Sequence, residues 1–194
     1  MKGPGSIPGS GATSLPDEAG SQERHFTNNR QRTGADGENE GGYRMKLREL
    51  FTPEVVNLDI ESESKDEILK ELIGLLGMDE KSEAILFKTL KRRENLGSTG
   101  IGKGIAIPHC RSLVVNRLRL AYGRKPGGVD FKAIDGNPVF HFFLIVAPPL
   151  EVSNQYLPVL GKIAQFAKDP AVPEELKEIS TPEDFLRLLE EKAH

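Results

Sequence analysis

One segment of this chain concentrates residues that can bind or transfer a phosphoryl group. Residues 92–111 have the sequence RRENLGSTGIGKGIAIPHCR, with His109 near the end. Histidine titrates close to neutral pH, and its neutral imidazole is a nucleophile. Phosphoryl transfer to such a ring depends on positioning, positive charge and hydrogen-bond donors more than on covalent help from the protein. The segment therefore predicts a phosphoryl site at His109.

The neighbours of this histidine supply the other groups that such a site requires. Arg92 or Arg93 offers a planar guanidinium with a permanent charge. Ser98 and Thr99 offer hydroxyl groups. Glycines let the backbone come close and point N–H groups inward, and the segment has four of them, Gly97, Gly100, Gly102 and Gly104. On residue types alone, a structural histidine and turn-forming glycines remain the alternative.

A nucleotide-binding loop is a competing interpretation of the same glycines. Gly97, Gly102 and Lys103 match the G-x-x-x-x-G-K part of a P-loop, but Gly104 stands where Ser or Thr must bind magnesium. A P-loop also follows a strand and precedes a helix, whereas the periodicity here predicts a helix before and a strand after. We therefore exclude this kind of nucleotide site.

Other reactive side chains give weaker indications. His141 lies within FHFF on a predicted strand, which favours a packing role. Cys110 adjoins His109, and adjacent strand residues point to opposite faces, so a Cys–His catalytic pair is not expected. Glu94 either orients Arg93 or faces solvent. The four histidines and single cysteine show no metal-ligand spacing.

The elements that position this segment alternate between helices and strands. Ser64 and Glu67 form a capping-box pattern before an amphipathic helix that Gly77 ends. A second helix is predicted over 79–94, a third opens at Ser153, and a fourth begins at Thr181 with proline in its first position. Strands are predicted over 54–60, 105–107, 118–123 and 139–146. This interleaving indicates an α/β fold.

Composition bounds the class of protein. The 194 residues are 37% hydrophobic and 28% charged, with a formal net charge of −3, so no general affinity for nucleic acid is expected. One cysteine excludes an internal disulfide, and no apolar run approaches the ~20 residues of a membrane span. We expect a cytoplasmic protein without membrane insertion.

The composition changes near Met45. Residues 1–44 have few large apolar side chains and predict a disordered extension, because such a segment cannot bury enough surface to offset its ordering entropy. A regulatory tail and a cloning remnant are both consistent with this composition. The predicted domain spans 45–194.

The segment around His109 also resembles a known family. It matches R-E-x-x-x-S-T-G-I-G-x-G-[IV]-A-[IV]-P-H, the active-site signature of enzyme IIA domains of the fructose/mannitol type in the sugar phosphotransferase system, nitrogen-regulatory branch included. GGVDFKAIDGNPV at 127–139 and FFLIVAPP at 142–149 resemble later family segments. The resemblance covers about Met45 to the C-terminus.

The resemblance implies a three-layer α/β/α sandwich with a mixed sheet. It implies that His109 accepts a phosphoryl group on Nε2 from the phosphocarrier HPr or its nitrogen-branch relative, and that Arg93 stabilises it. Loop residues lining the site would be Ser98, Thr99, Gly100 and Gly102. The acceptor would be a cysteine of an enzyme IIB domain, or else a regulatory target protein that binds the domain. No cofactor is implied.

The sequence departs from the family at one position. Many members carry a second histidine near the start of the helix after the last strand, and Tyr156 takes its place here. A phenol with a pKa near 10 donates one hydrogen bond but carries no positive charge near neutral pH. We expect transfer to survive with an altered rate or partner choice.

Three hypotheses follow for the function. The first is an active phosphocarrier that uses His109. The second is a regulatory binding module with the same fold and weak or no phosphotransfer, which Tyr156 favours. The third is a different enzyme that uses the glycine loop for a phosphorylated ligand.

Overall fold

The computed structural model describes residues 45–150 and 152–193; the predicted extension, residues 1–44, lies outside the described residues. Two short 3-10 turns come first, at Leu47–Leu50 and Pro53–Val55. Five helices follow along the described chain: α1 (Lys65–Gly74), α2 (Glu80–Asn95), α3 (Tyr156–Lys168), α4 (Val172–Glu178) and α5 (Pro182–Lys192). Within the described ranges, no helix is both long and apolar enough to cross a membrane.

A mixed sheet forms the middle of the molecule. Its strands are β1 (Val56–Asn57), β2 (Gly100–Gly102), β3 (Ile105–Ala106), β4 (His109–Arg111), β5 (Arg119–Val129) and β6 (Val139–Ala147). The order is β1-β5-β6-β3-β2, and β4 also pairs with β6. The pairs β1–β5, β3–β6 and β4–β6 are parallel, whereas β5–β6 and β2–β3 are antiparallel.

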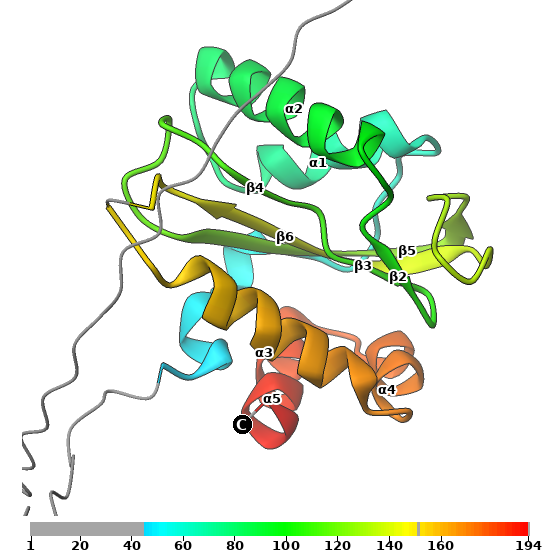
Figure 1. The fold of residues 1–194 in the computed structure, drawn as a ribbon. Coiled ribbons are helices and arrows are strands. Elements are labelled where there is room, and N and C mark those ends of the chain that lie inside the picture. Colours follow the sequence, from blue (N-terminus) through cyan, green and yellow to red (C-terminus); the bar gives the residue numbers. More distant parts are fainter. Residues whose placement is uncertain (1–44, 151, 194) are drawn as a thin grey trace, which may run out of the picture. The chain divides into compact units, whose positions relative to one another are not determined.

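Helices cover both faces of this sheet. Figure 1 shows α1 and α2 on one face and α3, α4 and α5 on the other. The α/β fold that the periodicities indicate and the three-layer arrangement that the family resemblance implies are therefore confirmed. Strand β6 is apolar along nearly its whole length because helices cover it on both sides. Phe143 and Ile145 pack in the cluster with α3 and α5, and Phe142 and Leu144 pack in the cluster with α1 and α2.

Side-chain caps fix where several helices begin. Ser64 forms the predicted capping box at α1, and Thr181 caps α5 as predicted and also completes a capping box with Asp184. The prediction for Ser153 is wrong, since α3 begins at Tyr156 after Gln155. The Ser153 hydroxyl instead accepts the N–H of Gln155 at 3.3 Å and closes a turn before the helix.

The strand predictions are partly right. Only Val56–Asn57 is a strand within 54–60, because Pro53 begins a 3-10 turn there. The strand predicted over 118–123 continues to Val129, with irregular pairing after Arg124. The short strands β2 and β4 and the helix α4 were not predicted. These elements have three, three and seven residues, which is too few for a periodicity to be detected.

Candidate functional site

His109 is the first residue of β4, which lies against β6 with His109 opposite Ile145. The next residue, Cys110, is buried in the core beneath α1 and α2. Because side chains alternate along a strand, His109 and Arg111 point to the opposite face, toward α3. The strand thus exposes a half-buried imidazole between the two helical layers.

The imidazole of His109 is held in one orientation by its own backbone. Nδ1 lies 2.6 Å from the carbonyl oxygen of Ile107. A carbonyl oxygen only accepts hydrogen bonds, so Nδ1 must carry the proton. The lone pair therefore resides on Nε2, which is the nucleophilic nitrogen of this ring.

Arg93 approaches that nitrogen from the last turn of α2. Its Nε lies 3.3 Å from His109 Nε2, and its Nη1 donates to the carbonyl oxygen of Gly97 at 2.9 Å. Of the two arginines that the sequence left open, the structure brings Arg93 to the histidine, whereas Arg92 is exposed. A fixed guanidinium beside Nε2 can neutralise negative charge arriving at that atom.

The surroundings keep His109 in its neutral form. Burial lowers the pKa of the imidazole below its usual value, and the charge on Arg93 lowers it further. The hydrogen bond to Ile107 and the carboxylate of Glu94 act in the opposite direction, but burial is the largest influence. The ring is therefore an uncharged nucleophile near neutral pH.

Glu94 holds the loop that follows α2, a role that the sequence did not predict. Its carboxylate is 7% exposed and accepts the N–H of Thr99 at 3.0 Å and also the Thr99 hydroxyl. Lys65, at the start of α1, forms an ion pair with Glu94 at 2.6 Å. Glu94 thus neither faces solvent nor orients Arg93 by direct contact, and both expectations were wrong.

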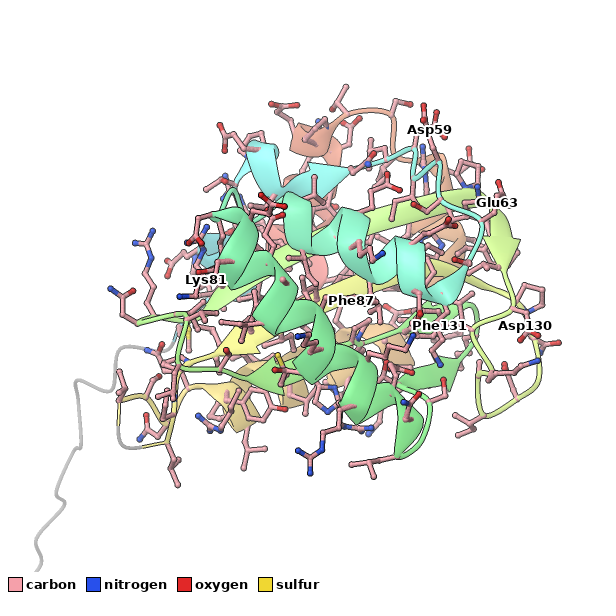
Figure 2. The ribbon with its side chains drawn as sticks, turned by 90° about the horizontal axis from the view of Figure 1, so that it is seen from above. Asp59, Glu63, Lys81, Phe87, Asp130 and Phe131 are labelled. Carbon is pink, nitrogen blue, oxygen red and sulfur yellow. The ribbon has the colours of Figure 1, made fainter. Side chains whose placement is uncertain are left out.

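Ser98 fixes the same loop to the β5–β6 connection. Its hydroxyl donates to the carbonyl oxygen of Phe131 at 2.8 Å and accepts the N–H of Gly100 at 3.1 Å. Lys65 donates to the same carbonyl at 3.0 Å, and its ammonium lies over the Phe131 ring. Figure 2 shows Phe131 beside the layer formed by α1 and α2.

These contacts lead to the histidine through the backbone. The carbonyl oxygen of Thr99 accepts a hydrogen bond from the N–H of Ile107 at 3.0 Å. The carbonyl oxygen of Ile107 in turn accepts a hydrogen bond from Nδ1–H of His109. Glu94 is therefore linked to His109 through Thr99 and Ile107. The hydroxyls of Ser98 and Thr99 are expected from sequence to line the site, but in the described part of the chain they hold this linkage and do not bond to His109.

The glycines form a β-hairpin. Gly102 and Gly104 have φ values of +89° and +73°, which only glycine adopts without strain, and they bracket the turn between β2 and β3. The predicted inward-pointing N–H is wrong for Gly100, because that group donates to the Ser98 hydroxyl. A Cβ at Gly100 would lie 2.8 Å from the backbone of Ala133, so a close approach requires glycine here.

Tyr156 lies at the site, at the first position of α3. Its ring centroid is 6.0 Å from that of His109. Burial raises the pKa of the phenol, so it remains neutral. Arg111, which no sequence motif indicated as a site residue, places its guanidinium carbon 4.6 Å from the centroid of the Tyr156 ring. Its position two residues after His109 on a strand was the available signal.

The remaining candidates lie apart from this chemistry. His141 is fully buried, and its Nδ1 is 2.9 Å from the Tyr122 hydroxyl, in agreement with the predicted packing role. Burial lowers the pKa of His141 to about 4. Burial also raises the pKa of the Cys110 thiol to about 12, so that thiol is unreactive near neutral pH.

Known proteins are similar to this chain in sequence and in fold. The chain is 31% identical over 152 residues to the "PTS system fructose-specific EIIABC component" of Bacillus subtilis, which covers 75% of this chain and 23% of that protein. It thus spans about a quarter of that relative. It is also 31% identical over 137 residues to the "Nitrogen regulatory protein" of Bradyrhizobium diazoefficiens, which covers 69% of this chain and 87% of the relative.

A solved structure and a family model agree with these relatives. The crystal structure of nitrogen regulatory protein IIA-Ntr from Neisseria meningitidis matches with a TM-score of 0.66 and 33% identity, over 74% of this chain and 98% of that one. Residues 49–192 match the family model described as "Phosphoenolpyruvate-dependent sugar phosphotransferase system, EIIA 2". The chain therefore belongs to the EIIA 2 family of this phosphotransferase system, whose members have phosphocarrier and regulatory roles.

Proposed function

We propose that this domain, spanning 45–194, carries a phosphoryl group on Nε2 of His109. The observation that supports this most directly is the 2.6 Å contact between Nδ1 and the Ile107 carbonyl, which leaves the lone pair on Nε2. Arg93 lies within 3.3 Å of that nitrogen and supplies the charge that phosphoryl oxygens need.

The proposed step is an in-line displacement. The Nε2 lone pair attacks the phosphorus of the donor, and the bond to the donor's leaving group breaks as the new N–P bond forms. The ring keeps its Nδ1 proton, and the Ile107 carbonyl stabilises the positive charge that the substituted imidazole acquires. Ser98, Thr99, Gly100 and Gly102 support this geometry by fixing the loop and the hairpin.

The proposed donor is HPr or its nitrogen-branch relative, and the proposed acceptor is a cysteine of an enzyme IIB domain or a regulatory target. Kinship with both a fructose-specific EIIABC component and nitrogen regulatory proteins supports these two outputs equally. The cytoplasm is the proposed compartment. A regulatory module with weak transfer is the second candidate, because Tyr156 lies beside His109 where many members have a histidine.

Intact-mass spectrometry after incubation with phosphoenolpyruvate, enzyme I and HPr tests the proposal. We expect the wild-type chain to gain one acid-labile phosphoryl group, His109→Ala to gain none, and His25→Ala, the matched control, to behave as wild type. The nitrogen-branch donors should be assayed in parallel. Absence of a gain with both donor sets would reject the carrier function and favour the binding module.

A further inference from the structure

A second cation faces the same site from the β4 strand. Arg111 and His109 leave the same face of β4, two residues apart. The guanidinium of Arg111 stacks on the ring of Tyr156, which in turn neighbours the His109 ring at 6.0 Å between centroids. Arg111, Tyr156 and His109 therefore follow one another as neighbours, and Arg93 contacts Nε2 of the same histidine.

The position of Arg111 is fixed by more than the stacking. Its Nη1 donates to the carbonyl oxygens of Pro148 at 2.7 Å and Ser153 at 3.2 Å, which lie between β6 and α3. Among the described residues, its Nε and Nη2 make no hydrogen bond, and no carboxylate forms an ion pair with it. Two donor groups of this guanidinium, Nε and Nη2, thus have no partner among the described residues, on the side of Tyr156 where the His109 ring also lies.

We propose that Arg111, held in place by Tyr156, provides the second positive charge that contacts the phosphoryl group on His109. This inference rests on the proposed carrier function. Tyr156 is then a positioning residue, which acts through its ring and not through its hydroxyl. A protonated histidine at the Tyr156 position would supply a positive charge to this site. Here Arg111 supplies that charge instead, and it is permanent.

Charge and tethering can be separated by substitution at Arg111. Arg111→Met removes the charge and both hydrogen bonds to the backbone, whereas Arg111→Lys keeps the charge but loses the planar guanidinium that stacks on Tyr156. We expect Arg111→Met to slow phosphoryl gain from phosphorylated HPr by on the order of 10²-fold. Arg111→Lys should be intermediate. Arg187→Met, which removes an exposed arginine paired with Asp184 on α5, is the matched control and should match wild type.

Substitutions at Tyr156 test the positioning role without altering Arg111. Tyr156→Leu removes the stacking surface and should slow transfer as Arg111→Met does. Tyr156→Phe restores the ring without the hydroxyl and should recover most of the lost rate. Circular dichroism and thermal melting would reveal whether Arg111→Met folds. If it does not, the comparison of Tyr156→Leu with Tyr156→Phe still tests the inference.

The possible results separate this inference from the carrier function. If wild type gains phosphoryl and Arg111→Met gains it as fast as Arg187→Met, the second cation is refuted while the carrier function stands. If Tyr156→Phe is as slow as Tyr156→Leu, the hydroxyl and not the ring is required, and the positioning role is refuted. If wild type itself takes no phosphoryl, the carrier function fails first and this inference fails with it.

Discussion

At His109, two neighbouring residues of α2 act on one ring in opposite directions. The positive charge of Arg93 disfavours the imidazolium and lowers the pKa of His109, whereas the negative charge of Glu94 favours it and raises that pKa. Both lie in the last turn of the same helix, but Arg93 bonds Nε2 directly and Glu94 is linked to the ring through Thr99 and Ile107. Because the two charges shift the pKa of His109 in opposite directions, substitutions at Arg93 and Glu94 can distinguish an electrostatic effect on that pKa from a general loosening of the loop.

We predict that Arg93→Met raises the pKa of His109 and that Glu94→Gln lowers it, because each variant removes the charge concerned. Titration of the ring nitrogens by ¹⁵N NMR would measure both shifts and would also identify Nδ1 as the protonated nitrogen. Arg93→Met should in addition slow phosphoryl gain by about 10²-fold. Shifts of the same sign in the two variants would contradict the charge argument and indicate a disordered loop.

At the scale of elements, the β2–β3 hairpin and the β5–β6 connection pack against each other closely enough to exclude a methyl group. A Cβ at Gly100 would lie 2.8 Å from both Cα and Cβ of Ala133, and the Gly100 carbonyl accepts the N–H of Ile134. Because Thr99, beside Gly100, bonds to Ile107, displacement of the hairpin would reach the backbone that orients His109.

We predict that Gly100→Ala destabilises the fold by about 1–3 kcal/mol, since backbone atoms cannot move aside as a flexible side chain can. It should also slow phosphoryl gain. Gly127→Ala is the matched control, because a Cβ at Gly127 meets nothing within 4 Å and its φ is not positive. Chemical denaturation monitored by circular dichroism would compare the two. Equal stability of both variants would show that the packing at Ala133 is more yielding than the structure indicates.

At the scale of the whole molecule, two histidines on the same face of the sheet have different roles. His109 is half-buried at the first position of β4, whereas His141 is fully buried in β6 and pairs with the Tyr122 hydroxyl. Protonation of His141 would place a charge in the core, which burial and the charges of Arg124 and Lys177 oppose. The cost of that protonation makes the stability of the fold depend on pH.

We predict that stability falls as the pH decreases from about 6.5 to about 4 and that His141 is a main cause. In this range the unfolded chain binds a proton at His141 and the folded chain does not, so acid favours unfolding by roughly 3 kcal/mol in total. Above pH 6.5 the effect is absent. Urea denaturation over this range should give a shallower pH dependence for His141→Gln than for wild type, whatever its absolute stability. Identical slopes would contradict the prediction.

The sequence alone determined the fold class and the family, and it predicted the central histidine. Alternating periodicities, the capping box at Ser64 and a long apolar strand are local properties, and each is visible within about ten residues. The signature around His109 lies in one continuous segment, so it also indicated Arg93. Ser153 was misinterpreted because a hydroxyl that caps a turn and one that caps a helix look alike in sequence.

Only the tertiary structure decided what Glu94, Tyr156 and Arg111 contact. Glu94 is buried because α1 brings Lys65 to it, and Tyr156 reaches His109 because α3 begins where β6 ends, beside β4. Arg111 acquires its stacking partner from a residue 45 positions later in the chain. These contacts join residues far apart in sequence, and no local pattern encodes them, because the packing of helices on a sheet creates them.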